Sequence, residues 1–125
     1  MKACIVGGGP AGLLFSLLFR RSHSHWQVEV IEQNARNVTF GFGVVFSQGA
    51  LEFLLRDAPD LYADLLPRMQ GWPMQRIVHR DQQVDIDGNG FSSIARLQLN
   101  QRLQGLCEAA GVTLRFGERV TDASA

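Results

Sequence analysis

The sequence predicts an α/β protein built around a parallel β-sheet. Two observations carry this prediction. The stretch IVGGGPAG at positions 5–12 places a glycine-rich turn between an apolar run and a second, helical apolar run. The stretch WQVEVIE at positions 26–32 then alternates as a strand and ends on an acid. Short connections through one helix force two such strands to lie parallel, so these segments form one strand-helix-strand unit.

The elements of this first unit follow from hydrophobic spacing. Residues 2–6 form a short apolar run that ends at glycines, which is typical of a strand buried on both faces and would bury Cys4. Residues 11–21 carry leucines at three- and four-residue spacing and end on two arginines, which favour the negative end of a helix dipole. We therefore expect a helix between two buried strands.

After Glu32 the pattern changes. A second strand-helix unit does not begin; residues 33–50 predict a long loop instead. The remaining pattern predicts short helices at 51–56 and 58–67, two strands at 75–80 and 82–86, a helix at 95–110 that Gly111 stops, and a strand at 112–116.

The glycine turn has the spacing G-x-G-x-x-G, formed by Gly7, Gly9 and Gly12. The first glycine permits a tight turn, the second lets a pyrophosphate approach the backbone, and the third allows close packing of helix on strand. Pro10 and Ala11 open the helix, where a proline loses no hydrogen bond and leaves the helix dipole directed at an anion. The turn predicts a dinucleotide site and a Rossmann-like, three-layer FAD/NAD(P)-binding fold.

Glu32 ends the second strand twenty residues after Gly12, where a carboxylate can accept hydrogen bonds from the hydroxyls of an adenosine ribose. NADP is disfavoured because Glu32 would repel a 2′-phosphate and Gln33 offers no compensating cation. Between NAD and FAD, the long excursion after Glu32 favours FAD. A mononucleotide P-loop is excluded because Leu13 and Leu14 stand where lysine and serine or threonine are needed.

The composition of the chain limits the classes of binding partner that the sequence predicts. The 12 basic and 12 acidic residues balance, so the sequence predicts no partner among nucleic acids or membranes. Cys4 and Cys107 show no paired spacing, which indicates a reducing, cytoplasmic environment and inert core thiols. The apolar start is too interrupted for a signal peptide.

Some sequence patterns that resemble functional motifs have simpler structural explanations. Asp85, Asp87 and Asn89 resemble the opening of a calcium loop, but its twelfth position is Arg96 rather than glutamate, so no metal site is expected. The aromatic side chains at positions 15, 19, 53 and 116 fall at core-like positions and are interpreted as packing.

The stretches CIVGGGPAGL, VEVIEQN, TFGFGVVFS and GNGFSSIARLQLNQRL together resemble single-component FAD-dependent aromatic hydroxylases, the p-hydroxybenzoate hydroxylase-like monooxygenases. Among these, the chain is most similar to the branch with salicyloyl-CoA and 2-aminobenzoyl-CoA monooxygenases and the tryptophan-hydroxylating enzyme of violacein synthesis. The resemblance implies FAD as cofactor, NAD(P)H as reductant, and O₂ and a small aromatic molecule, of aryl-CoA or indole type, as substrates.

Carried over to this sequence, the resemblance assigns three groups of residues. The glycine turn and Glu32 would hold the ADP half of FAD. The segment Gly41, Gly43, Val44 and Val45 matches the loop near the flavin, although the arginine that many relatives carry there is missing. Arg96, in the pattern R-x-x-L-x-x-x-L, matches a position that reaches the pyrophosphate or ribityl chain.

The resemblance also implies that residues 1–125 are the N-terminal portion of an FAD-binding domain. The second flavin motif and the substrate domain would lie beyond residue 125, so the chain is expected to be truncated and inactive alone. Two alternatives stay open: another FAD-dependent oxidoreductase, such as a halogenase or a reductase, and a non-catalytic module that binds NAD or ADP.

Overall fold

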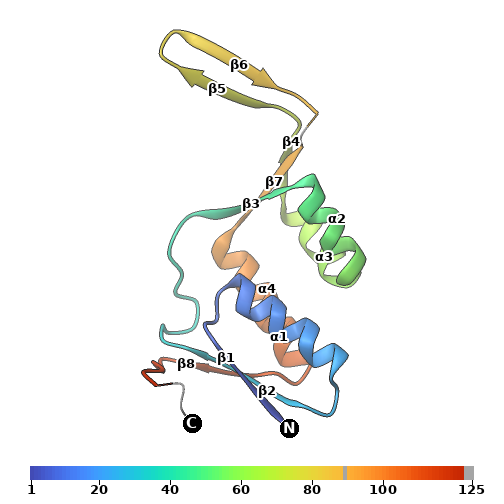
Figure 1. Ribbon diagram of the computed structural model, residues 1–125, viewed down its shortest axis with the longest axis vertical. Coiled ribbons are helices and arrows are strands. Elements are labelled where there is room, and N and C mark those ends of the chain that lie inside the picture. The colour runs from blue at the N-terminus through green and yellow to red at the C-terminus, as the bar shows by residue number, and fades with distance from the viewer. Residues whose placement is uncertain (89, 123–125) are drawn as a thin grey trace. The chain divides into compact units, whose positions relative to one another are not determined.

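The computed structural model describes residues 1–88 and 90–122 and is drawn in Figure 1. Asn89, part of the calcium-like stretch, lies outside the described residues. The chain divides into two compact units. The first unit comprises Met1–Gly41 together with Arg96–Ala125, and the second comprises Phe42–Ala95.

The first unit is a parallel sheet with two helices. Its strands are β1 (Lys2–Val6), β2 (Gln27–Glu32) and β8 (Thr113–Phe116), in the order β1-β2-β8, and its helices are α1 (Pro10–Ser22) and α4 (Arg96–Ala109). Both strand pairs are parallel. Helices α1 and α4 lie side by side over this sheet (Figure 1). The predicted α/β class with a parallel sheet is confirmed.

The core of this unit forms where α1 and α4 meet β2. Leu13 and Leu17 of α1 are fully buried, as the three- and four-residue spacing predicts. Helix α1 contacts β2 and α4, whose buried side chains include Val28, Val30, Leu99, Leu103 and Cys107. The Sγ of Cys107 donates a hydrogen bond to the carbonyl oxygen of Leu13 at 3.2 Å, which links α4 to α1.

The expectation that residues 2–6 are buried on both faces is wrong. Among the described residues β1 pairs only with β2, so it is an edge strand of the sheet. Its residues alternate, with Cys4 exposed and Val6 63% exposed. An apolar run alone does not distinguish a central strand from an edge strand, because that difference depends on which strands pair beside it.

The second unit contains an antiparallel sheet, a helical pair and a hairpin. The sheet has the order β3-β7-β4. The elements are β3 (Gly43–Ser47), α2 (Gln48–Asp57), α3 (Pro59–Leu65), the 3-10 turn η1 (Leu66–Arg68), β4 (Gln70–Trp72), β5 (Gln75–His79), β6 (Gln82–Ile86) and β7 (Phe91–Ala95). The predicted hairpin is confirmed as the pair β5-β6.

Three features of this unit differ from the sequence prediction. The expected loop 33–50 contains β3, whose partner β7 was not predicted either; the pairing joins Val44 to Ile94 across about fifty residues, which local patterns cannot reveal. The expected helix 58–67 gives way to η1 at Leu66, because Pro67 has no amide hydrogen with which to continue the α-helical hydrogen bonds. Phe53 is 46% exposed and, in the first unit, Phe15 is 56% exposed, so neither is a core residue.

Candidate functional site

The glycine turn connects β1 to α1 and is built as its spacing predicts. Gly7 has φ +109°, a conformation that strains any residue with a Cβ. A Cβ on Gly12 would lie 2.1 Å from the carbonyl oxygen of Gly7, so this position admits only glycine. The backbone amide of Gly7 donates to the carbonyl of Ile31 at 2.8 Å, which holds the turn against β2.

Gly9 is the N-cap of α1, and Pro10 is at the first helical position. A Cβ on Gly9 would meet no described heavy atom within 4 Å, so the space beside it is open. No described side chain caps this helix N-terminus, and Ala11 is exposed next to it. Free amide donors and the positive end of the helix dipole make such a terminus suited to an anion.

Glu32 is bonded to this turn. Its Oε2 accepts from the backbone amide of Gly8 at 2.8 Å. Its Oε1 accepts from the backbone amide and the side-chain amide of Asn34, at 2.8 and 2.6 Å. Burial acts to raise the pKa of Glu32, but the donors from Asn34 and Gly8 outweigh it, so the pKa lies below its ordinary value. The carboxylate is therefore charged and engages the turn directly.

A cavity of about 150 Å³ lies beside the turn, wholly within the first unit. Gly8, Gly9 and Glu32 line one part of it, and α4 lines another with Arg96, Asn100 and Gln104. The structure thus brings three of the predicted site residues, Gly9, Glu32 and Arg96, to one cavity.

Two buried polar atoms of residues that line this cavity have no hydrogen-bond partner among the described residues. They are the Nε of Arg96, a donor, and the Oδ1 of Asn100, an acceptor. Leu99 and Leu103, the leucines of the predicted R-x-x-L-x-x-x-L pattern, are 3% and 2% exposed and belong to the core. The helix therefore packs its leucines into the core and contributes a polar edge to the cavity.

Sequence reasoning missed Gly8, Asn34, Asn100 and Gln104. The last two were detectable: they follow Arg96 at intervals of four residues, and this spacing places all three on one face of a helix. The sequence pattern does not single out Gly8, because it lies between two glycines of the motif. In the structure a Cβ on Gly8 would lie 2.9 Å from the Cβ of Glu32, so this position also requires glycine.

A second cavity, of about 310 Å³, opens at the carboxyl ends of β1 and β2. Gly7, Glu32 and Gln33 line it together with Arg119. Glu32 thus borders both cavities. In open parallel sheets ligands bind at the carboxyl ends of the strands, which is where both cavities lie.

The flavin-loop residues are divided between the two units. Gly41 belongs to the first; its φ is +89°, and a Cβ there would lie 3.8 Å from an Nη of Arg96. Gly43, Val44 and Val45 belong to β3 of the second unit and form a strand rather than a loop. There, a Cβ on Gly43 would lie 3.0 Å from the carbonyl oxygen of Ile94.

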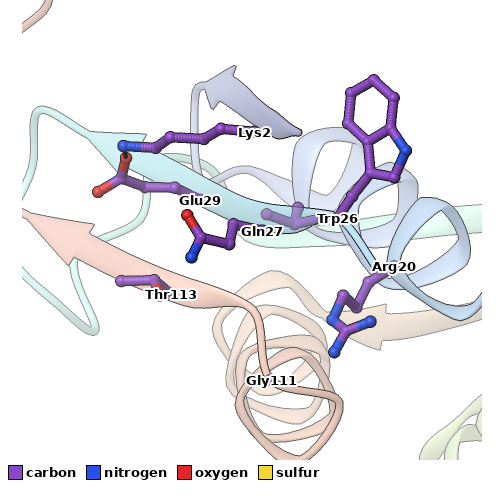
Figure 2. A pocket seen from close by; sticks show the side chains of 8 residues that line it. Lys2, Arg20, Trp26, Gln27, Glu29, Gly111 and Thr113 are labelled. Atoms are coloured by element: carbon purple, nitrogen blue, oxygen red, sulfur yellow. Dashed lines mark ion pairs between the residues drawn. The ribbon is translucent and has the colours of Figure 1, made fainter. Parts of the chain in front are cut away.

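The cavity in Figure 2, about 330 Å³, lies by contrast at the amino ends of the strands. Its charged groups are already engaged. The Nζ of Lys2 pairs with the Oε2 of Glu29 at 2.6 Å, the dashed line in Figure 2, and Arg20 donates to the carbonyl of Ser24. This cavity is larger than the one beside the turn, but its cationic side chains are already bonded within the chain and are less available to an anionic ligand.

Two negative findings apply to residues 1–88 and 90–122. These residues contain no cluster of three or more histidine, cysteine, aspartate or glutamate side chains placed to hold a metal ion. None of the helices formed by them is long and apolar enough to cross a bilayer.

Comparison with known proteins places the chain beside aromatic monooxygenases. No family model matches it. It is 34% identical over 122 residues to a salicyloyl-CoA 5-hydroxylase of a Streptomyces species, which covers 98% of this chain and 24% of that protein. It is 29% identical to a 3-hydroxy-4-methyl-anthranilyl-[aryl-carrier protein] 5-monooxygenase of Streptosporangium sibiricum, over 94% of this chain and 33% of that protein. It is 26% identical to the protodeoxyviolaceinate monooxygenase of Chromobacterium violaceum, over 93% and 31%.

The fold also matches part of a known oxygenase structure. The structure of 2-methyl-3-hydroxypyridine-5-carboxylic acid oxygenase matches with a TM-score of 0.77 at 21% identity, over 93% of this chain and 31% of that one. The chain spans between about a quarter and a third of the length of the three monooxygenases that it matches in sequence. The resemblance to aromatic monooxygenases that the sequence motifs indicated is confirmed.

Proposed function

We propose that this chain is the nucleotide-binding segment of an FAD-dependent monooxygenase that hydroxylates an aromatic ring, using NAD(P)H and O₂. The similarity to three aromatic monooxygenases supports the reaction class. The domain assignment follows from it: residues 1–125 form part of an FAD-binding domain.

The observation that carries the proposal is the cavity beside the glycine turn. It combines the open side of Gly9 with the unpartnered Nε of Arg96 and the charged carboxylate of Glu32. Arg96 lines this cavity, and a guanidinium can pair with pyrophosphate oxygens through charge-assisted hydrogen bonds. The residues present therefore fit the ADP half of a dinucleotide.

The residues of the chain bind and orient the cofactor in this proposal. The amides at the start of α1 and the guanidinium of Arg96 hold the pyrophosphate, while Glu32 fixes the turn and accepts from the ribose. Pro10 and Ala11 shape the helix start, Gln33 lies beside the ribose, and Gly41, Gly43, Val44 and Val45 approach the flavin end. FAD held there would supply the redox chemistry: reduction by hydride from the nicotinamide, and activation of O₂ so that one oxygen atom goes to the ring and the other to water.

An aromatic acyl thioester is the substrate class that the comparisons favour. Two of the three relatives are named for an aryl-CoA or an aryl-carrier protein substrate, and in both names the aromatic acid is attached to a carrier. The third is named for protodeoxyviolaceinate, and an indole-type ring is the alternative substrate. The free thiols Cys4 and Cys107 fit the reducing conditions of a cytoplasmic location.

Titration of the purified chain with FAD, ADP and NAD tests the cofactor assignment. Flavin fluorescence follows FAD directly, and calorimetry follows the two colourless ligands. We expect ADP to compete with FAD, because both would occupy the same cavity. We expect weak binding, because the cavity beside the turn has only about 150 Å³ and ligand sites usually enclose about 300–1,000 Å³.

The outcomes separate the alternatives. Binding of FAD and ADP, with NAD bound more weakly than FAD, supports the proposal. Binding of NAD in preference to FAD would favour a non-catalytic nucleotide module, and no binding of any of the three would contradict the dinucleotide site. A halogenase or a reductase would share the FAD result, and hydroxylation of an aryl-CoA by a longer protein that includes this segment would exclude both.

A further inference from the structure

One wall of the cavity beside the glycine turn is a segment without helix or strand. It comprises residues 35–41, between β2 and β3 (Figure 1), and is here called the strap. Ala35, Val38, Thr39 and Phe40 of the strap line the cavity, and the turn and α4 line other parts of it. The cavity measures about 150 Å³, whereas ligand sites usually enclose about 300–1,000 Å³. A nucleotide therefore needs more room than the strap leaves in this conformation.

The strap has few interactions that resist its opening. None of its seven residues is buried, and its apolar side chains Val38 and Phe40 are 49% and 72% exposed. One main-chain hydrogen bond, from the amide of Val38 to the carbonyl oxygen of Ala35 at 3.2 Å, begins and ends within the strap. A segment with so little buried apolar surface opens locally at a small cost in free energy.

Two side-chain contacts join the strap to α4. An Nη of Arg36 donates to both carboxylate oxygens of Glu108, at 2.7 and 2.8 Å. The Nε2 of Gln101 donates to the Oδ1 of Asn37 at 3.1 Å. Both contacts are exposed, and the side chains of the ion pair are 47% and 43% exposed. Exposed pairs of this kind contribute little to stability, so these contacts can hold the strap closed and still break readily.

We propose that the strap is a gate, which opens when its contacts with Glu108 and Gln101 break, admits the nucleotide, and closes again beside the glycine turn. This inference rests on the proposed function. Glu108 and Gln101 stand outside the set of residues that line the cavity. The two contacts therefore control the rates at which the nucleotide enters and leaves, and not its affinity.

Stopped-flow binding of FAD, followed by flavin fluorescence, compares the wild-type chain with Glu108→Gln. Loss of the ion pair makes opening easier, so the association and dissociation rates should both rise, by about two- to fivefold. The dissociation constant should stay within about twofold of wild type, because the contact is present both in the closed free chain and in the closed complex. Loss of a contact to the ligand itself would act mostly on the dissociation rate.

Asp85→Asn is the matched control. It breaks the pair between Arg76 and Asp85, which is also exposed and also has two hydrogen bonds, but belongs to the second unit. Both rates should stay at their wild-type values. Exchanging the charges, with Arg36→Glu and Glu108→Arg in one chain, restores an ion pair and should return both rates toward wild type.

Hydrogen exchange of the free chain measures opening without any ligand. The amides of residues 35–41 should exchange about two- to fivefold faster in Glu108→Gln than in wild type, while the amides of α1 keep their rates. This readout depends on the contact between Arg36 and Glu108 and not on nucleotide binding.

Two results would overturn the gate. One is equal exchange of residues 35–41 in the two chains. The other is a rise of the dissociation rate alone in Glu108→Gln, because Glu108 would then stabilise the complex without controlling entry. In both cases the wild-type chain still binds FAD and the proposed function stands. A wild-type chain that binds neither FAD nor ADP contradicts the proposed function itself, and the gate with it.

Discussion

The carboxylate of Glu32 accepts a 2.8 Å hydrogen bond from the backbone amide of Gly8, across 24 residues of sequence. The acid at the end of β2 and the glycine turn after β1 are therefore one structural unit. Glu32 has two tasks in consequence: it braces the turn in the free chain, and in the proposed complex it also accepts from the nucleotide.

Replacing Glu32 by glutamine should reduce both stability and nucleotide binding. Glutamine keeps one acceptor oxygen but turns an NH₂ group toward the donors from Gly8 or Asn34. Loss of one hydrogen bond to a charged group costs about 1.5–3 kcal/mol. Urea unfolding should show a loss of this size, and ADP calorimetry a weaker complex. An unchanged urea midpoint would contradict the bracing role.

Stability should fall in acid, partly through Glu32. Its pKa in the folded chain lies below the ordinary value of 4.5, so its contribution is fully present above that value and is lost as the pH falls through the lowered folded pKa. Glu29 adds to the same slope, because Lys2 and Arg115 lower its pKa too. Urea unfolding between pH 6 and pH 3 should show a shallower pH dependence for Glu32→Gln than for wild type. Equal slopes would mean that Glu32 titrates normally.

The glycines of the turn should separate folding from binding. Gly12→Ala places a Cβ 2.1 Å from the carbonyl oxygen of Gly7 and should destabilise the chain at the upper end of about 1–3 kcal/mol. Gly9→Val fills open space and should cost less stability while abolishing ADP binding. Thermal unfolding and ADP calorimetry on both variants check this contrast. A Gly9→Val chain that binds ADP like wild type would exclude a pyrophosphate beside Gly9.

Arg96 should act on the phosphates and not on the nucleoside. Arg96→Met removes the guanidinium that lines the cavity, so ADP binding should weaken by about 1.5–3 kcal/mol while adenosine binding stays the same. Arg96→Lys should restore little, because lysine lacks the planar set of donors. Calorimetry with both ligands measures the difference. Equal losses for ADP and adenosine would point to a packing role for Arg96.

The two cysteines should differ in reactivity. Burial raises the pKa of the Cys107 thiol to about 11, whereas Cys4 is exposed on β1. Because the thiolate is the reactive form, a disulfide reagent at pH 8 should label Cys4 quickly and Cys107 only after unfolding. Counting labelled thiols with and without urea checks this. Two fast thiols in the folded chain would contradict the burial of Cys107.

The sequence determined those features that depend on neighbouring residues. The spacing of Gly7, Gly9 and Gly12 and the leucines of α1 predicted the turn and its helix, and the position of Glu32 predicted an acid beside that turn. These patterns are informative because a tight turn, a helix face and a strand-helix-strand connection are each formed within about thirty residues.

Tertiary structure decided what depends on distant partners. The edge position of β1, and with it the exposure of Cys4, follows from which strands pair in the sheet. Strand β3 exists because β7, about fifty residues later, pairs with it. The spacing of Arg96, Asn100 and Gln104 already places them on one face of α4, but only the packing of α4 against α1 brings that face to the cavity beside Glu32. Such pairings are set by packing between remote segments, and the local order of residues carries no signal of them.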